Sequence, residues 1–451
     1  MENISKFQEK LIKTCKQYMF LQERKKIDIS TSALCFFTIW ADTPGCYKIF
    51  NLAGINKRFN ALFVLKNLFS ISKIHYLDIS FDITKIPSKK INLIISYSSK
   101  RNFDTNGNFK DDYFNFSSKD TNYFWILISL DNFVPRNIKN NIAIISYKKG
   151  LFKYNFLYLI KSFYTVFKDN RFNYKKIIHF CWEETNFAKK VSHLCNYLFK
   201  NLNIKNLILN YEGIPFQHQL LKDIKKIDSK IKTLGYLHCA PWPIQSDLIF
   251  KNQSLDNLIV SGKQQKNVLK KFLGWKKKRI SVIPSLRFYK QNRNEFSGYL
   301  FAPYNLEKKN NYLKRLEEYL KKMKKKRLIK FSVRIHPLNK KSQIHQEFKK
   351  KCELIISSYL SNNRIKTSNH SLFFGSATGV CVQALEEGTT ITHFPQNESL
   401  DVFSNKLWPN LKIKRIGDKI FEYKTKNKNQ IFFTSKEKGK FKKYLFPLLK
   451  S

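Results

Sequence analysis

Short apolar runs alternate with segments of helical periodicity through most of the first half of the chain. Strands buried on both faces give continuous apolar runs, whereas covering helices place apolar residues at every third or fourth position. This alternation is typical of parallel α/β units. Strands are expected at 91–97, 123–130, 141–147, 177–180, 206–210, 233–238 and 257–262, with helices at 186–201 and 215–227.

After the segment 279–289 the sequence becomes polar, and the same alternation then begins again. We therefore predict an α/β protein of two Rossmann-like domains, over 1–289 and 297–430, followed by a basic C-terminal tail at 431–451. The tail mixes basic and apolar residues, which suits either packing on the first domain or contact with a membrane surface. Residues 1–90 fit this scheme poorly. In the second half, strands are expected at 299–304, 328–337, 371–376 and 389–395, with helices at 306–326, 347–360 and 378–388.

The charge of the chain is strongly positive, because 83 Lys and Arg against 33 Asp and Glu give a net charge of +50 over 451 residues. Such a charge favours nucleic-acid binding, so a non-catalytic nucleic-acid or polyanion-binding protein is an alternative of another class. The lysines are spread over every segment, however, as an AT-rich coding sequence would produce. We therefore expect no specific nucleic-acid partner. The charge also suits peripheral contact with an anionic membrane.

The sequence gives no sign of export or of membrane insertion. No apolar run reaches the roughly 18 residues that a spanning helix needs. Residues 1–10 lack the basic and then apolar pattern of a signal peptide. The eight cysteines are scattered without a C-x-x-C pair, which is typical of reduced thiols. We expect a cytoplasmic protein, with a peripheral position at the inner face of the membrane as the alternative.

Polar residues follow two neighbouring strands of the expected first sheet. Glu212 and Gly213 come after 206–210, and His238 ends 233–238. Ligands bind beyond the carboxyl ends of parallel strands, so these residues are candidates for a binding site. His238 and Trp242 are expected near the same sheet edge. A buried turn anchored by Trp242 and the prolines beside it is an equally good interpretation.

A second acidic pair, Glu183 and Glu184, also follows an expected strand. It is the main rival of Glu212 for the role of a catalytic base in the first domain.

The stretch "FFGSATGV" in the second half has the order strand, glycine, hydroxyl residues, glycine, helix. Gly375 and Gly379 allow a tight turn and close approach to a ligand. Ser376 and Thr378 can cap the helix or donate hydrogen bonds to phosphate oxygens. The free N–H groups of a helix N-terminus suit a phosphate, although an ordinary helix cap without a ligand is an equal alternative.

His336 and Pro337 end the expected strand 328–337. The proline fixes the chain beyond the strand, and the histidine can donate a hydrogen bond to a phosphate or a proton to a leaving group. We expect this strand to lie beside 371–376, so that His336 and Ser376 share one phosphate.

Together these residues resemble the motifs of bacterial glycosyltransferases of the two-domain GT-B type, in particular sialyltransferases, polysialyltransferases and related surface-carbohydrate biosynthesis proteins. Those families carry an acidic-acidic-glycine motif, then a His-Pro motif, then a pair of hydroxyl residues. Here "YEG" at 211–213, "HP" at 336–337 and "SAT" at 376–378 occupy these positions in the same order. The resemblance covers about 205 to 400.

The resemblance implies two Rossmann-like domains that face a central cleft. It implies an inverting transfer of a sialic-acid-like sugar from a nucleotide donor, CMP-linked by analogy, to a surface glycan or glycolipid. Glu212 would act as the general base, with Gly213 leaving room for the sugar, and His336 as its partner at the donor phosphate. His238 and Trp242 would line the acceptor pocket, where an aromatic face can stack on a sugar. Capsule Kdo transferases and polyol-phosphate transferases have similar turns, so transfer of Kdo or a polyol phosphate is the alternative.

The sequence departs from the family pattern at three positions. Tyr211 replaces the first acidic residue, Ala377 separates the hydroxyl residues, and Gln383 stands where a ribose-binding Glu is common. No two aspartates are spaced as D-x-D, the pattern that holds a divalent cation on a diphosphate in the metal-dependent fold. We therefore expect no metal and no cofactor besides the nucleotide-sugar substrate.

Overall fold

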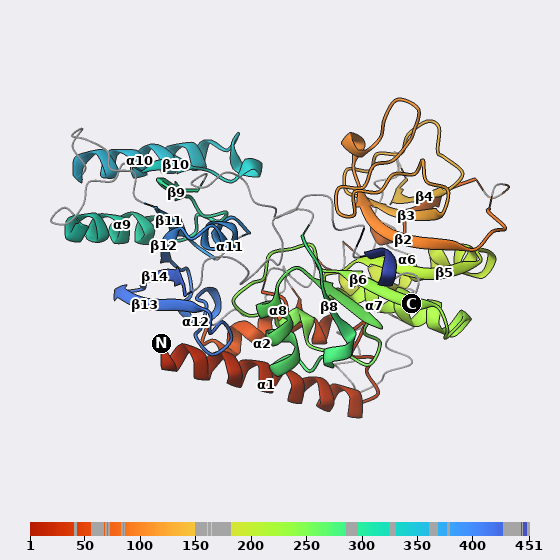
Figure 1. The fold of residues 1–451 in the computed structure, drawn as a ribbon, viewed down its shortest axis with the longest axis horizontal. Coiled ribbons are helices and arrows are strands. Elements are labelled where there is room, and N and C mark those ends of the chain that lie inside the picture. The colour runs from red at the N-terminus through yellow and green to blue at the C-terminus, as the bar shows by residue number, and fades with distance from the viewer. Residues whose placement is uncertain are drawn as a thin grey trace.

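The protein is a mixed α/β structure with two mostly parallel sheets (Figure 1). This confirms the expected class of fold. The expected strand 177–180 and Thr378 lie outside the described residues. The structure is a computed structural model that describes residues 1–39, 43–55, 67, 70, 73–82, 84, 86–148, 160, 164, 182–285, 296–323, 331–359, 369–376, 379–426, 443 and 445–448.

The first sheet has eight strands in the order β1-β4-β3-β2-β5-β6-β7-β8. Every neighbouring pair is parallel except β1 and β4. The strands β2 to β7 coincide with expected apolar runs to within a few residues. The bounds are β1 (Leu77–Ser80), β2 (Ile91–Ser98), β3 (Tyr123–Ser129), β4 (Ile142–Tyr147), β5 (Ile204–Asn210), β6 (Lys232–Tyr236), β7 (Asn257–Val260) and β8 (Ile280–Val282).

Both faces of the first sheet are buried, which explains its continuous apolar runs. Alternate residues of one strand join different cores: Leu93 packs in the core that includes helices α6 and α7, and Ile94 packs on the opposite face. That opposite face is covered in part by Phe109 and its neighbours. The helices that accompany this sheet are α2 (Pro44–Leu52), α6 (Glu183–Asn201), α7 (Pro215–Ile227) and α8 (Lys263–Lys271).

The second sheet has six strands in the order β10-β9-β11-β12-β14-β13. The first four are parallel, and β14 and β13 extend the sheet as an antiparallel pair. The strands are β9 (Tyr299–Phe301), β10 (Ser332–Arg334), β11 (His370–Phe374), β12 (Thr390–Phe394), β13 (Leu411–Gly417) and β14 (Ile420–Thr425). The helices are α9 (Lys309–Met323), α10 (Gln343–Tyr359), α11 (Gly379–Glu386) and α12 (Glu398–Asp401).

The strand order corrects one expectation about the second sheet. β9 lies between β10 and β11, so the strands that precede His336 and Ser376 are not neighbours. Two strand spacings amount to roughly 10 Å, which is too far for both side chains to reach one phosphate oxygen directly. After β9 the chain forms β10 on one side of it and then β11 on the other side. This reversal cannot be recognised from the order of the motifs in the sequence.

The two lobes, residues 43–285 and 296–426, are tied together by buried hydrogen bonds. The indole of Trp408 donates to the carbonyl of Pro243 at 3.0 Å, and Gln264 Nε2 donates to Leu407 O at 3.1 Å. One continuous apolar cluster includes side chains of both lobes.

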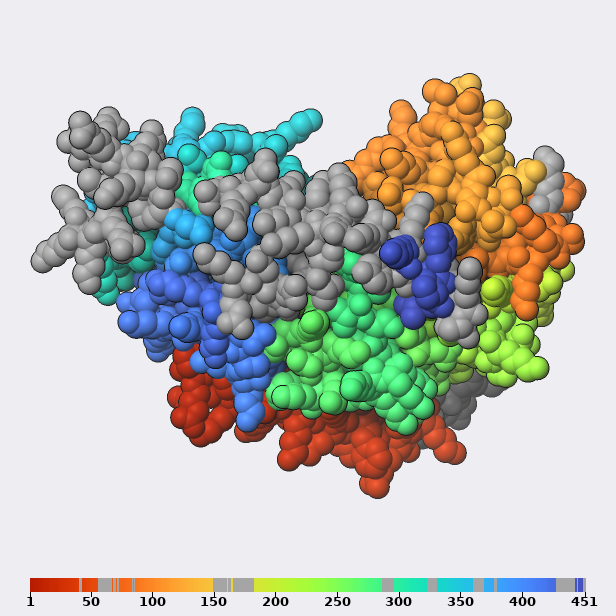
Figure 2. All heavy atoms as spheres, viewed as in Figure 1, coloured from red at the N-terminus to blue at the C-terminus, as the bar shows by residue number. Residues whose placement is uncertain are grey.

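Two segments near the ends of the sequence pack against parts of the protein that are distant in the chain. Helix α1 (Glu2–Arg24) runs beneath both lobes (Figure 1), and Gln8 Nε2 donates to Val402 O at 2.8 Å. Residues 443 and 445–448 lie on the first lobe (dark blue in Figure 2), where Leu445 is fully buried in the same core as Phe116. The part of the tail that is described therefore packs on the first lobe, one of its two expected placements.

Among the described residues, no helix combines the length and the apolar character that crossing a bilayer requires. The seven cysteines in the described part of the chain are all free thiols.

Candidate functional site

A pocket of about 570 Å³ opens at the carboxyl edge of the first sheet. The strand order reverses between β2 and β5, since the chain fills one side through β3 and β4 and the other through β6 to β8. Open α/β sheets bind ligands in the crevice at such a switch point. The pocket lies there: Tyr97 is the second-last residue of β2, Glu212 follows β5, and Leu237 follows β6.

The turn that carries Glu212 is fixed by one buried side chain. Gln217, in the first turn of α7, accepts hydrogen bonds from the backbone N–H groups of Glu212 at 2.9 Å and Gly213 at 3.1 Å. Its Nε2 donates to Asn210 O at 2.6 Å. Pro215 begins α7 and needs no hydrogen bond on its nitrogen. Glu212 is therefore presented by a backbone whose polar groups are paired.

Gly213 has a role that differs from the expected one. Its φ is +74°, and a Cβ at this position would lie 2.8 Å from the carbonyl oxygen of Asp247. The space beside it is filled by the backbone of the chain, so Gly213 does not provide room for a sugar. It is required for a left-handed turn under a close backbone contact.

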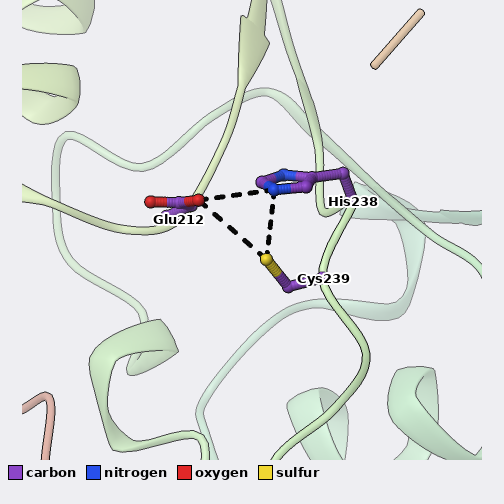
Figure 3. Close-up of side chains that lie close together, drawn as sticks. All are labelled: Glu212, His238 and Cys239. Carbon is purple, nitrogen blue, oxygen red and sulfur yellow. Dashed lines mark hydrogen bonds and ion pairs between the residues drawn. The ribbon is translucent and has the colours of Figure 1, made fainter. Parts of the chain in front are cut away.

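Three side chains converge at the end of β5 and β6 (Figure 3). His238 Nε2 lies 3.5 Å from Glu212 Oε1 and 3.1 Å from Cys239 Sγ, and the thiol lies 3.9 Å from Glu212 Oε1. His238 is 6% exposed and packs against the ring of Tyr113, whereas the Glu212 side chain keeps 35% of its exposure. His238 thus lies behind Glu212, which faces the pocket together with Cys239.

The surroundings make the Glu212 carboxylate a stronger base than an exposed one. Burial raises the pKa of Glu212, and the hydrogen bond from Cys239 offsets part of this shift. Burial also raises the pKa of Asp247 to about 7, and the charge of Glu212 adds to that effect. Asp247 therefore titrates near neutral pH beside a Glu212 whose own pKa is also raised by burial.

The rival pair lies in the same pocket. Glu183 and Glu184 form its wall together with Glu212 and Asp247. Both residues belong to the first turn of α6, where a helix N-terminus stabilises negative charge. The helix N-terminus therefore explains why these two positions are acidic. Glu212 has no such explanation, because it lies ahead of α7 and outside the helix.

Glu212, His238 and Cys239 could also hold a metal ion. Their donor atoms lie within 4.8 Å of one another. Carboxylate, imidazole and thiolate are ligands of zinc, which binds three protein groups and a water in catalytic sites. These donors stand in contrast to the metal-free site that the sequence predicts.

The glycine-rich turn of the second lobe is held by a second set of contacts. Gly375 has a φ of +81°, and its carbonyl accepts a hydrogen bond from His393. The hydroxyl of Ser376 donates to Asp401 at 2.9 Å. Burial raises the pKa of Asp401 to about 6. A phosphate at Ser376 would accept the hydrogen bond that the Ser376 hydroxyl now donates to Asp401. The Asp401 carboxyl group would then have to be protonated to avoid repelling the phosphate.

The other expected donor-side residues lie on or near the same sheet edge. His336 is exposed and accepts a weak hydrogen bond from the N–H of Leu338, while Pro337 begins a short 3₁₀ helix. Partial burial lowers the pKa of His336. Gly379 is the first residue of α11, and Gln383 is half-buried on that helix.

Of the expected acceptor-side residues, Trp242 lines the pocket, whereas Gly213 and His238 do not. The pocket includes Glu212 and Trp242. Within the described residues, no hydrogen bond, ion pair or pocket wall joins Glu212 to His336 or Ser376. The sequence patterns do not reveal Gln217, Cys239, Gln245, Asp247 or Gln265, of which only Cys239 stands directly beside an expected residue.

A comparison with known proteins finds no family model and no curated protein that matches the chain.

Proposed function

We propose that the protein is an inverting glycosyltransferase of the GT-B type that works without a metal and uses Glu212 as its general base. The observation that carries the proposal is the position of Glu212: a carboxylate of raised pKa, on a fixed turn, in a pocket at the switch point of the sheet. The pocket has apolar and aromatic walls that suit a sugar ring.

In the proposed reaction, the acceptor hydroxyl lies in this pocket and gives its proton to Glu212. The oxygen then bonds to the anomeric carbon of the donor sugar, and the bond from that carbon to the nucleotide phosphate breaks. A proton held by Asp247 near neutral pH keeps the two carboxyl groups from being charged together. General-base catalysis of this kind accelerates a reaction by roughly 10²–10⁴-fold.

The donor belongs to the second lobe in this proposal. The N–H groups at the start of α11, together with the hydroxyl of Ser376, would stabilise the leaving phosphate. A CMP-linked, sialic-acid-like sugar rests on the resemblance of the three motifs, and so does a surface glycan or glycolipid as acceptor. Transfer of Kdo or of a polyol phosphate would use the same residues and is the alternative. Either reaction would take place in the cytoplasm or at the inner face of the membrane.

The nucleic-acid alternative receives less support from the pocket. Of the described residues that line it, none is Lys, Arg or His, although the chain carries a net charge of +50. Four carboxyl groups would repel a phosphate backbone there.

The decisive experiment combines nucleotide binding with three matched variants. Thermal shifts with CMP, CDP, UDP and GDP identify the donor nucleotide, and transfer from the corresponding sugar is then measured. Glu212→Gln should lower turnover by roughly 10²–10⁴-fold and leave nucleotide binding intact, because the amide keeps its size but accepts no proton. Glu183→Gln and Glu184→Gln are controls in the same pocket. Wild-type turnover of Glu212→Gln with a large loss in either control would transfer the role of base to that residue.

A further inference from the structure

Glu212, His238 and Cys239 bring three different metal-binding atoms to one point beside the pocket (Figure 3). His238 and Cys239 are neighbours in the sequence, and neighbouring side chains of an extended strand point to opposite faces. The chain bends at Cys239, just past the end of β6, so that both side chains lie close to Glu212 beyond the end of β5. The three donors are therefore brought together by the fold of two adjacent strand ends.

The spacing of the donor atoms matches that around a tetrahedral zinc ion. Bonds of about 2.0–2.3 Å from zinc to oxygen, nitrogen and sulfur, at tetrahedral angles, place the donors about 3.3–3.6 Å apart. The measured separations are 3.5 Å between His238 Nε2 and Glu212 Oε1, 3.1 Å between His238 Nε2 and Cys239 Sγ, and 3.9 Å between Cys239 Sγ and Glu212 Oε1. Every separation thus lies within about 0.5 Å of the value that zinc requires.

The charge of the surrounding pocket is a second, independent observation that favours a cation. Its described lining contains the carboxyl groups of Glu183, Glu184, Glu212 and Asp247 and no Lys, Arg or His, although the chain carries a net charge of +50. Glu183 and Glu184 lie in the first turn of α6, where the helix N-terminus stabilises their charge. Glu212 lies outside any helix, so a bound cation would supply the counter-charge that the described lining does not give it.

The chemistry of the three donors selects among cations. Mg²⁺ and Ca²⁺ prefer oxygen ligands, whereas imidazole and thiolate suit zinc. A protonated amine would match the charge but would not use the nitrogen and sulfur donors. Glu212 and Cys239 line the pocket, so an ion can reach them from it. Zinc held by three protein groups keeps a fourth position for water, as in zinc sites that open to a pocket.

We propose that Glu212, His238 and Cys239 form a zinc site and that Zn²⁺ bound there inhibits the protein. On binding, the Cys239 thiol loses its proton to the solvent, and neutral His238 binds through Nε2. Glu212 then holds the ion with the carboxylate that would accept the proton of the acceptor hydroxyl, so that zinc and acceptor compete. The site itself does not depend on the proposed function, whereas the inhibition rests on it.

Metal titration of the reduced full chain tests the site apart from catalysis. Zn²⁺ binding is measured by calorimetry, and Co²⁺ serves as a spectroscopic probe. One Zn²⁺ should bind with release of protons, and Co²⁺ should show the charge-transfer absorption of a thiolate ligand, whereas Mg²⁺ should not compete. Absence of the charge-transfer absorption, or competition by Mg²⁺, would overturn the proposal.

Three variants remove one donor each: Glu212→Gln, His238→Gln and Cys239→Ser. Each should weaken Zn²⁺ binding by roughly 10-fold or more, because loss of a residue that only supports a ligand already costs about 10–100-fold in affinity. Cys239→Ser should also abolish the charge-transfer absorption. His238 is buried against Tyr113, so its variant is checked by urea unfolding, and the two residues that line the pocket decide the result.

Glu183→Gln and Cys352→Ala are the matched controls. Glu183 lies in the same pocket outside the group of donors, and Cys352 is a buried thiol of the second lobe. Both should bind Zn²⁺ much as the wild type does. Unchanged affinity in Glu212→Gln and Cys239→Ser, or an equal loss in the two controls, would overturn the zinc site.

Transfer assays separate this inference from the proposed function. Inhibition by Zn²⁺ that EDTA reverses, and that is weaker in Cys239→Ser relative to its own uninhibited rate, would support both. Zinc binding at this site with full turnover would refute the inhibition and leave the site standing. Turnover that requires zinc would refute the metal-free reaction, whereas turnover that needs Glu212 in a chain that binds no zinc would refute this inference alone.

Discussion

Replacement of Gln217 by Ala should destabilise the turn that presents Glu212. The side chain is 1% exposed and makes three hydrogen bonds to backbone groups of residues 210, 212 and 213. Each buried group left unpaired costs about 1–3 kcal/mol. Because a water can enter the vacated space and restore part of the bonding, the lower end of the sum applies, a loss of about 3 kcal/mol in the free energy of unfolding.

Urea unfolding measures this loss, and a transfer assay on the folded variant measures its effect on the site. Gln219→Ala is the control on the same helix, since Gln219 is partly exposed and bonds only to the Asp223 side chain. It should cost less than about 1 kcal/mol, as surface substitutions do. If Gln217→Ala unfolds within about 0.5 kcal/mol of the wild type, the turn is held by other contacts and the reasoning fails.

Two further predictions concern pH and metal. Burial raises the pKa of Asp401 from 3.8 to about 6, so the folded chain binds this proton more tightly than the unfolded chain. Stability should then fall by up to about 3 kcal/mol as pH rises from about 4 to about 6, and Asp401→Asn should remove that decline in urea titrations at each pH. A decline of equal size in the variant would assign it to other groups. Turnover should survive EDTA, whereas added Zn²⁺ should lower it by occupying Glu212, and Cys239→Ser should weaken this inhibition. Activity that EDTA abolishes and Zn²⁺ restores would instead make the metal part of the mechanism.

The sequence predicts strands β2 to β7 well because each is buried on both faces and gives a continuous apolar run. The elements that it misses have weaker patterns. Helix α1 buries Ile4, Leu11 and Cys15 at helical spacing, but Gln8 and Gln22 interrupt its apolar stripe. Gln8 is buried because it bonds to Val402 in a distant segment, and no local pattern reveals such a partner. The antiparallel strands β13 and β14 expose alternate residues and so resemble a polar loop.

The candidate site is predictable only in part for a similar reason. Glu212 and Trp242 follow strands that are adjacent in both the chain and the sheet, so strand-end reasoning brings them together. His336 and Ser376 also follow strands, but β9 separates them in space. Gln265 contributes from the start of a helix, where a polar residue is ordinary, and its burial becomes visible only in the folded chain.

The crossing of α1 has a consequence for the order in which the chain can fold during synthesis. Gln8 pairs with Val402, and Lys16 pairs with Phe272, so the helix cannot complete its contacts until most of the chain has left the ribosome. At synthesis rates of about 5–20 residues per second, the delay is on the order of tens of seconds. During that interval an amphipathic helix with an uncovered apolar stripe is available to chaperones. The first lobe therefore cannot complete its fold in step with its emergence from the ribosome. A nascent chain arrested before residue 402 should leave α1 open to proteolysis.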